Sequence, residues 1–266
     1  MPPIFIVDSF TNKPFGGNPA AVCILEKDMP DSWMQSVATE MNLSETAFLQ
    51  KMADGYVLRW FTPATEVDLC GHATLASAHI LWEKGLVDTK DEIRFHTRSG
   101  ILSATHSNKD LIEINLPAEP DEQVIVVPEI ATALATRILY MGQNRMDYIV
   151  EISSDIVLQN LQPDMALLKD VKTRGVIVTA KSSSPKYDFI SRFFAPAVGI
   201  DEDPVTGSAH CCLAPYWAKK LDKKEFTAYQ ASARGGELSV RLVGDRVYMS
   251  GHAVTVMEGS FRVAGK

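Results

Sequence analysis

The chain has 266 residues, of which 46% are hydrophobic and 22% charged, a composition typical of globular proteins. Its net charge of −7 gives no basic surface for nucleic acid or an anionic membrane. No apolar run is long enough to span a bilayer, no signal peptide is expected, and the four cysteines form no CxxC motif. We therefore expect a cytoplasmic protein with reduced thiols.

Hydrophobic patterning predicts the elements of the first half. An amphipathic helix is expected over 30–41, with Asp31 or Ser32 as its cap. A helix with few charges is expected over 71–84, with Gly85 just past its end, as suits a helix surrounded by other elements. Strands are expected at 4–10, 21–25, 46–50, 56–61, 92–97, 101–106 and 111–116.

The second half repeats this style after 117–122, a proline-rich and acidic stretch that is the best linker candidate. Helices are expected at 127–135 and 207–221, and Pro215 should kink the latter or mark an early turn. Strands are expected at 138–141, 148–152, 175–180, 187–194, 226–232, 238–243, 247–250 and 253–258.

These patterns predict an α+β fold of two domains, 1–117 and 118–266, with the last few residues able to pack back on the first half. Each domain is expected to be a twisted or barrel-like sheet, mainly antiparallel, around one buried helix.

Two stretches of the chain resemble each other. The first contains FTPA (61–64) and CGHA (70–73), and the second contains FAPA (194–197) and TGSA (206–209). His72 and Ser208 lie 136 positions apart, which is also the spacing of two later matched arginines. A constant spacing indicates a duplicated fold, so two helix N-termini would face one cleft. Their N–H groups and dipoles favour an anion there, most simply a carboxylate.

The residues at these two helix starts are candidates for substrate binding. Gly71 and Gly207 would let the backbone approach a ligand closely, and His72 and Ser208 follow in the first turns, where Ala73 is a further contact. Each motif could instead only cap and pack its helix. Asp203, next to Pro204, is the best candidate for a proton carrier or the orienter of a substrate amine, although turn chemistry also favours acids there.

Three further residues could carry chemistry in the first half. Glu45 enters an apolar strand, where burial would suit it to general acid–base work, although an exposed position is the commoner alternative. Cys70 precedes a helix N-terminus and could be a base, a nucleophile or a small buried residue. Asn18, in the glycine-rich turn GGNP, could contact a substrate or only cap the turn. No histidine spacing indicates a metal site, and no nucleotide-binding motif occurs.

At these motifs the chain resembles the PhzF-like (phenazine-biosynthesis-like) family of the diaminopimelate epimerase superfold, over nearly its full length. The motifs that carry the resemblance are GNPAAV (17–22), NLSETAF (42–48), FTP (61–63), CGHAT (70–74), EDPVTGSA (202–209) and RGGEL (234–238).

The resemblance implies two pseudo-symmetric halves with the active site between them, a homodimer, and no metal or organic cofactor. It also implies a glutamate that moves a proton within dihydro-hydroxyanthranilate, at the position of Glu45, assisted by residues that match His72, Asp203 and Ser208. Cys70 departs from the isomerase pattern toward the racemases, but its partner thiol is missing.

Three hypotheses follow. The first is a cofactor-independent isomerase that acts on a small carboxylate through Glu45 as general acid and base. The second is an amino-acid racemase or epimerase that uses Cys70, with Glu45 or Asp203 as the opposite base. The third, from another class, is a non-catalytic metabolite-binding or interaction protein on the same scaffold.

Overall fold

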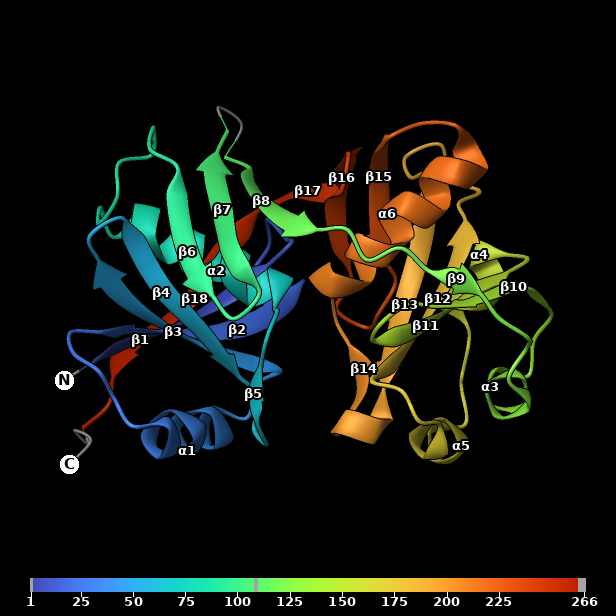
Figure 1. Cartoon of the computed structure of the whole chain (residues 1–266), viewed down its shortest axis with the longest axis horizontal. Helices are drawn as coiled ribbons and strands as arrows, with labels where there is room; N and C mark the ends of the chain where they lie inside the picture. Colours follow the sequence, from blue (N-terminus) through green and yellow to red (C-terminus); the bar gives the residue numbers. More distant parts are fainter. Residues whose placement is uncertain (1, 108–109, 263–266) are drawn as a thin grey trace. The chain divides into compact units, whose positions relative to one another are not determined.

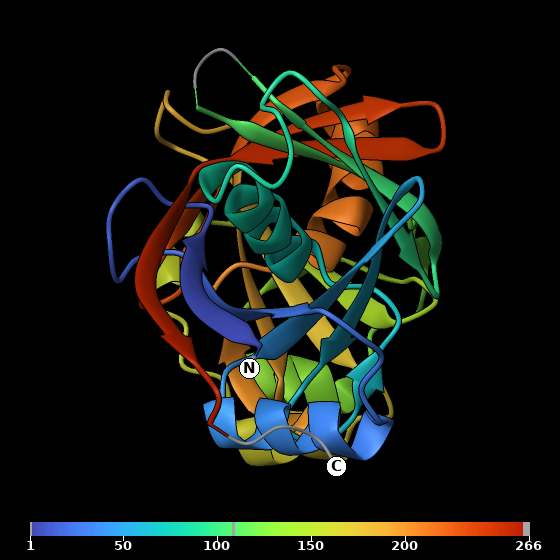
Figure 2. The same cartoon turned by 90° about the vertical axis from the view of Figure 1, so that its left-hand side faces the viewer.

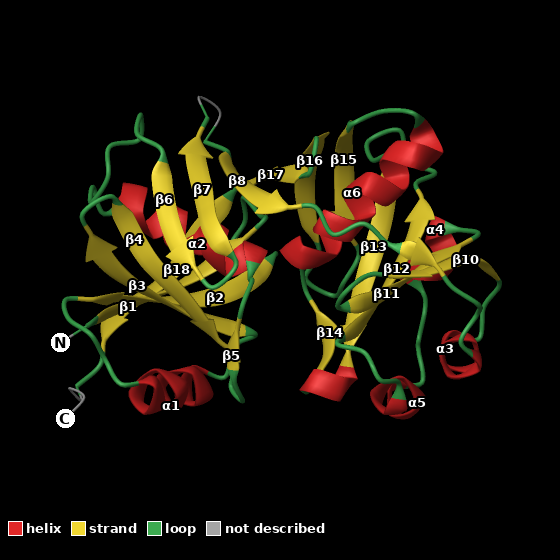
Figure 3. Cartoon of the chain, in the orientation of Figure 1, coloured by secondary structure: helices red, strands yellow, loops and turns green. Residues whose placement is uncertain are grey.

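The computed structural model describes residues 2–107 and 110–262. Their contacts group into two units, Met1–Leu116 with Met249–Lys266, and Pro117–Tyr248. Each unit is described by itself below, with the elements labelled in Figure 1 and coloured by type in Figure 3. Within the described ranges, no helix is both long enough and apolar enough to cross a membrane.

The first unit is a strand-rich fold with two helices, α1 (Asp31–Met41) and α2 (Gly71–Glu83). Its strands are β1 (Pro3–Ser9), β2 (Asn18–Leu25), β3 (Glu45–Met52), β4 (Gly55–Phe61), β5 (Glu66–Val67), β6 (Ile93–Thr97), β7 (Gly100–His106), β8 (Ile112–Pro117) and β18 (Ala253–Ser260). Strand β1 pairs antiparallel with β18 and β2, and β2 pairs parallel with β3. The order continues with β4 antiparallel to β3, β6 parallel to β4, and β7 and β8 antiparallel in turn.

Helix α2 is the centre of this unit. It packs against β1, β2, β3 and β18, and strands surround it in Figure 2. Nearly all of its residues are buried, from Gly71 to Ala78 and from Ile80 to Trp82. This confirms the interpretation of its low charge as the mark of a surrounded helix. The C-cap is Lys84, and Gly85 follows with a φ of 63°, which confirms the predicted terminal glycine.

Helix α1 packs against strands β3 and β4. Its residues Met34, Val37 and Ala38 are buried in a cluster with Phe48 and Phe61.

The predicted cap of α1 is wrong. The N-cap is Pro30, and its side chain forms no capping hydrogen bond. Asp31 lies inside the helix, where its Oδ1 accepts a hydrogen bond from Arg59 Nη1 at 2.8 Å. Ser32 is one residue further into the first turn. Both predicted residues therefore lie past the capping position.

The second unit contains α3 (Pro128–Leu134), α4 (Asp155–Gln159), α5 (Met165–Asp170), a 3₁₀ turn η1 (Pro196–Val198) and α6 (Gly207–Leu221). Its strands are β9 (Glu122–Gln123), β10 (Ile138–Gln143), β11 (Asp147–Ile152), β12 (Gly175–Lys181), β13 (Phe189–Ala195), β14 (Ile200–Asp203), β15 (Glu225–Gln230) and β16 (Gly236–Val243). Strand β17 (Arg246–Gly251) spans the boundary of the two units.

The second unit repeats the pairing pattern of the first. Strands β10 and β11 are antiparallel, β11 and β12 parallel, β12 and β13 antiparallel, β13 and β15 parallel, and β15 and β16 antiparallel. The strands from β1 to β7 pair in the same order of antiparallel and parallel neighbours. The short strands β5 and β14 match as well, because each pairs antiparallel with the strand before it. Helices α2 and α6 occupy matching places in the chain. Helix α2 comes between β4 and β6, and α6 between β13 and β15, and each of these two strand pairs is parallel. The predicted α+β fold with two similar halves is confirmed.

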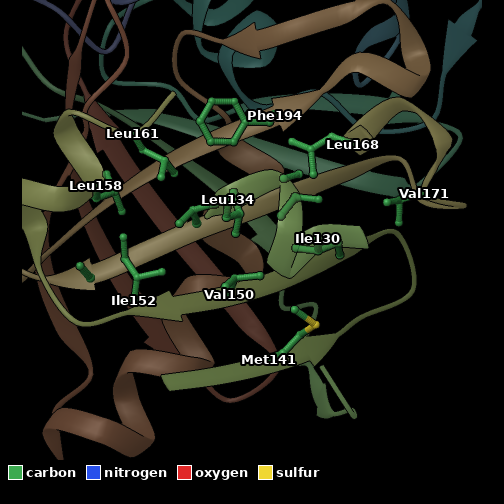
Figure 4. Packing of buried hydrophobic residues seen from close by; sticks show 14 of the residues in the cluster. Ile130, Leu134, Met141, Val150, Ile152, Leu158, Leu161, Leu168, Val171 and Phe194 are labelled. Carbon is green, nitrogen blue, oxygen red and sulfur yellow. The ribbon is translucent and has the colours of Figure 1, made fainter. Parts of the chain in front are cut away.

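One hydrophobic cluster of the second unit lies between its sheet and the short helices. Ile130 and Leu134 of α3, Leu158 of α4 and Leu168 of α5 pack with Val150 of β11 and further strand residues, as Figure 4 shows.

Pro215 does not interrupt α6, which runs unbroken for 15 residues. A proline at this position cannot donate a hydrogen bond to the carbonyl of Cys211, four residues earlier. That carbonyl accepts instead from the backbone N–H of Glu119 at 3.0 Å. The freed acceptor is satisfied, so the helix tolerates the proline.

Candidate functional site

The first group of candidate residues lies at the start of α2. Cys70 is the N-cap residue in extended conformation, and no side chain caps the helix. Gly71, His72 and Ala73 form the first turn and are all buried. The backbone N–H groups of a first turn have no partner within the helix, and the helix dipole is positive there. The predicted binding residues therefore lie together at the N-terminus of α2, which is suited to binding an anion.

His72 contacts three other candidate residues. Its Nε2 lies 3.3 Å from Glu45 Oε2, and its Nδ1 lies 3.1 Å from Asn18 Nδ2 and 3.5 Å from Cys70 Sγ. The Ser9 hydroxyl also donates to the backbone carbonyl of His72 at 2.8 Å. Strand ends supply these contacts, because Asn18 begins β2, Glu45 begins β3 and Ser9 ends β1.

The tautomer of the His72 ring follows from the direction of its hydrogen bond with Asn18. When Asn18 donates through Nδ2, the Nδ1 atom accepts and the ring proton lies on Nε2, facing the Glu45 carboxylate. The side chains of His72 and Glu45 are only 3% and 15% exposed. A proton moved along this pair is therefore largely shielded from bulk water, which limits its loss to solvent.

Glu45, Cys70 and His72 each place one possible metal-ligand atom within 4.8 Å of the others. However, Cys70 lies on the Nδ1 side of the imidazole and Glu45 on the Nε2 side. One ring nitrogen that bound a metal ion would face only one of these two groups. The arrangement suits a proton relay through the ring better than a metal centre.

The second group lies at the start of α6. Asp203 ends β14, Thr206 is the N-cap residue in extended conformation, and Gly207 and Ser208 open the helix. The exposed fractions of Asp203 and Ser208 are 6% and 4%. The Thr206 hydroxyl lies 2.5 Å from Asp203 Oδ2, which ties the predicted carboxylate to the helix start.

Gln230 is a residue that the sequence did not single out. It ends β15 and is fully buried. Its side-chain amide bonds the backbone of Asp203 and both the backbone and hydroxyl of Thr206. A glutamine at a strand end carries no signal of this role in a single sequence, because the partner loop lies 24 or more residues earlier.

The remaining cysteines show no sign of chemistry. Burial raises the pKa of the Cys23 thiol to about 12 and that of Cys211 to about 12, and it also raises the pKa of Cys212. None of the four cysteines, all of which lie in the described ranges, forms a disulfide. The three whose pKa is raised act as buried apolar residues.

Comparison with known proteins gives a consistent result. A family model described as phenazine biosynthesis-like protein matches residues 7–259. An uncharacterized isomerase of Halalkalibacterium halodurans is 59% identical over 256 residues, which cover 96% of each chain. The crystal structure of a PhzF-family phenazine biosynthesis protein from Enterococcus faecalis has a TM-score of 0.92 at 41% identity, covering 98% of this chain and 99% of its own.

A more distant structure extends the similarity of fold. A predicted epimerase from Pseudomonas aeruginosa has a TM-score of 0.79 at 18% identity, covering 99% of this chain and 100% of its own. At this identity the likeness concerns the fold alone.

Proposed function

The chain belongs to the phenazine biosynthesis-like family and is an isomerase, and we propose that it moves a proton within a small carboxylate-bearing metabolite without a cofactor. In this proposal Glu45 is the general base and then the general acid. It removes a proton from a carbon next to a carbonyl or unsaturated group and returns it to another atom of the same molecule. No electrons leave or enter the substrate.

The contact between Glu45 and His72 carries the proposal. Asn18 contacts the Nδ1 atom of the imidazole, and the Ser9 hydroxyl donates to the His72 backbone carbonyl. With the residue held in this way, Nε2 lies 3.3 Å from the Glu45 carboxylate. A proton on Nε2 stabilises the ionised Glu45 that must accept the substrate proton. Once Glu45 is protonated, the carbonyl oxygen of its carboxyl group can still accept from the same N–H. The pair can therefore hold both protonation states that a shuttle passes through.

The two helix starts support a carboxylate-bearing substrate. First-turn N–H groups at Gly71 to Ala73 and at Gly207 to Ser208 favour a negative group. We assign Asp203 to the substrate amine or to the proton transfer, and Ser208 to substrate binding, on the matching family motifs. A homodimer and a cytoplasmic location complete the proposal.

A deuterium-uptake screen tests the function directly. Wild-type protein and Glu45→Gln are incubated in D2O with small amino- and hydroxy-carboxylates, including dihydro-hydroxyanthranilate, and mass spectrometry reads the gain of solvent deuterium. Glu119→Gln is the matched control, because its side chain is 16% exposed and lies in the other unit. We expect uptake by wild type and the control but not by Glu45→Gln. Full uptake by Glu45→Gln would remove Glu45 as the base.

One observation favours a second candidate, a racemase or epimerase that uses Cys70. Its Sγ lies 3.5 Å from His72 Nδ1, and an imidazole partner activates a thiol. The variant Cys70→Ser in the same screen separates the two functions. The isomerase predicts uptake within about 3-fold of wild type, which is under 1 kcal/mol in the barrier. Loss of uptake together with loss of stereochemical inversion would favour the racemase.

A further inference from the structure

A chain of hydrogen bonds in the second unit runs from the end of β15 to the Asp203 carboxylate. Gln230 Nε2 lies 2.8 Å from the Asp203 carbonyl oxygen and 3.0 Å from Thr206 Oγ1. Gln230 Oε1 accepts from the Thr206 backbone N–H at 2.8 Å. Thr206 Oγ1 in turn lies 2.5 Å from Asp203 Oδ2. All three residues are at least nine-tenths buried.

The direction of every bond in this chain is determined. The Asp203 carbonyl can only accept and the Thr206 N–H can only donate, so the Gln230 amide has one possible orientation. Its Nε2 therefore donates to the Thr206 hydroxyl oxygen. The single proton of that hydroxyl is left to donate to Asp203 Oδ2.

We propose that Thr206 and Gln230 are positioning residues for the reaction: Gln230 directs the Thr206 hydroxyl onto Asp203, which holds that carboxylate in one orientation. The inference rests on the proposed function, which gives Asp203 a part in proton transfer or in holding the substrate. A buried carboxylate that receives a charge-assisted hydrogen bond is both better stabilised and less free to rotate.

The position of Thr206 separates this role from ordinary helix capping. An N-cap side chain that only stabilises its helix accepts a hydrogen bond from the second or third residue of the first turn. The Thr206 side chain makes no such bond. Its hydroxyl proton points away from the helix, to Asp203.

The test compares three single variants in the full chain. Thr206→Val removes the hydroxyl at nearly constant volume, and Thr206→Ser keeps it. Thr179→Val is the matched control, because Thr179 is a buried threonine of the same unit. Its hydroxyl also donates once, to the Ile190 carbonyl, and accepts once, from Trp217 Nε1.

The activity readout is the split between kcat and KM on the substrate that the deuterium screen identifies. Loss of a hydrogen bond to a charged group predicts a fall in kcat of roughly 10-fold in Thr206→Val, with KM within about 2-fold. Thr206→Ser should recover kcat to within about 3-fold, and Thr179→Val should leave kcat unchanged. An equal fall in Thr206→Val and Thr179→Val would mean a merely structural role and would overturn the inference, as would an unchanged kcat in Thr206→Val.

A second readout does not need turnover. In protein labelled at the aspartate carboxyl carbons, the Asp203 signal should shift in Thr206→Val and stay in place in Thr206→Ser and Thr179→Val. An unmoved signal in Thr206→Val overturns the inference whatever the activity. If wild type takes up no deuterium, the proposed function fails, and positioning for that reaction fails with it. A signal that still shifts then shows only that the contact exists.

Gln230→Glu provides an independent variant. Glutamate has the shape of glutamine but only accepts hydrogen bonds when ionised, so it would draw the Thr206 proton away from Asp203. We expect kcat to fall as in Thr206→Val. Should the variant fail to fold, the Thr206 pair decides the question alone.

Discussion

His210 should make the protein lose stability in mild acid. It is fully buried on α6, and its Nδ1 donates to the Thr206 carbonyl at 2.8 Å. The ring centroid of Phe189 lies 6.1 Å away. Burial lowers the pKa of His210 from 6.5 to about 4, because the charged imidazolium would be far from water. The hydrogen bond to Thr206 offsets only part of this shift.

The sign and size of the effect follow from this shift. The folded pKa lies below the unfolded value, so between pH 6.5 and 4 the unfolded chain binds the extra proton. The free energy of unfolding is therefore not reduced by His210 above pH 6.5, and it falls as the pH drops from 6.5 toward 4. Linkage gives a loss of about 2 kcal/mol between pH 7 and 5, and about 3 kcal/mol between pH 7 and 4.

The assay is urea denaturation at pH 7, 6 and 5, followed by tryptophan fluorescence, for wild type and His210→Asn. Asparagine places an amide donor near the Nδ1 position, so the bond to Thr206 can be kept, while nothing titrates. The variant is expected to be less stable at pH 7 because it leaves a cavity. Its free energy of unfolding should fall by about 2 kcal/mol less than that of wild type between pH 7 and 5. Parallel pH dependences in the two proteins would refute the reasoning.

Two predictions concern stability elsewhere. In urea denaturation, Gly17→Ala should lower the free energy of unfolding by at least about 1 kcal/mol more than Gly85→Ala does. Both glycines have positive φ, but of the two only Gly17 lies where an added Cβ would meet a backbone carbonyl. Equal losses would mean that φ alone decides the effect. Arg174→Met should cost about 3–5 kcal/mol by the same measurement, because it leaves the fully buried Asp147 carboxylate without its ion-pair partner. A loss below 1 kcal/mol would show that water or another group replaces the guanidinium.

The sequence predicted the long elements of the fold well because their patterns are local. Helix α2 is buried on nearly all sides and carries few charges, and the strands from β1 to β4 alternate or run apolar. The short helices α4 and α5 were missed because five or six residues carry too little periodicity. The short strands β5, β9 and β14 were missed for the same reason.

The candidate site was predicted in part. Asn18, Glu45, Cys70 and His72 come from three separate motifs, and the structure brings their side chains together. Which nitrogen of the imidazole faces which partner could not be predicted, since it depends on how β2, β3 and α2 pack. The role of Gln230 was beyond the sequence for the same reason. The division into domains at 117 and the roles of the site residues stay predictions.

The two halves share the pairing pattern of their strands but differ in the side chains at the start of the central helix. Cys70 and Thr206 occupy the same N-cap position, and four residues later Thr74 and His210 each donate a side-chain hydrogen bond to that residue's carbonyl, at 2.5 and 2.8 Å. In the first half the cap side chain is a thiol beside an imidazole. In the second half it is a hydroxyl.

That hydroxyl is committed, because its proton is donated to Asp203 and its oxygen accepts from Gln230. A racemase with two thiols needs a free acid–base group at both cap positions, one for each face of the carbon. A threonine hydroxyl ionises far less readily than a thiol, and here it is held by two buried partners. The asymmetry at this one matched position therefore favours one-carboxylate proton transfer through Glu45 over a two-thiol mechanism, even though the fold that carries it is duplicated.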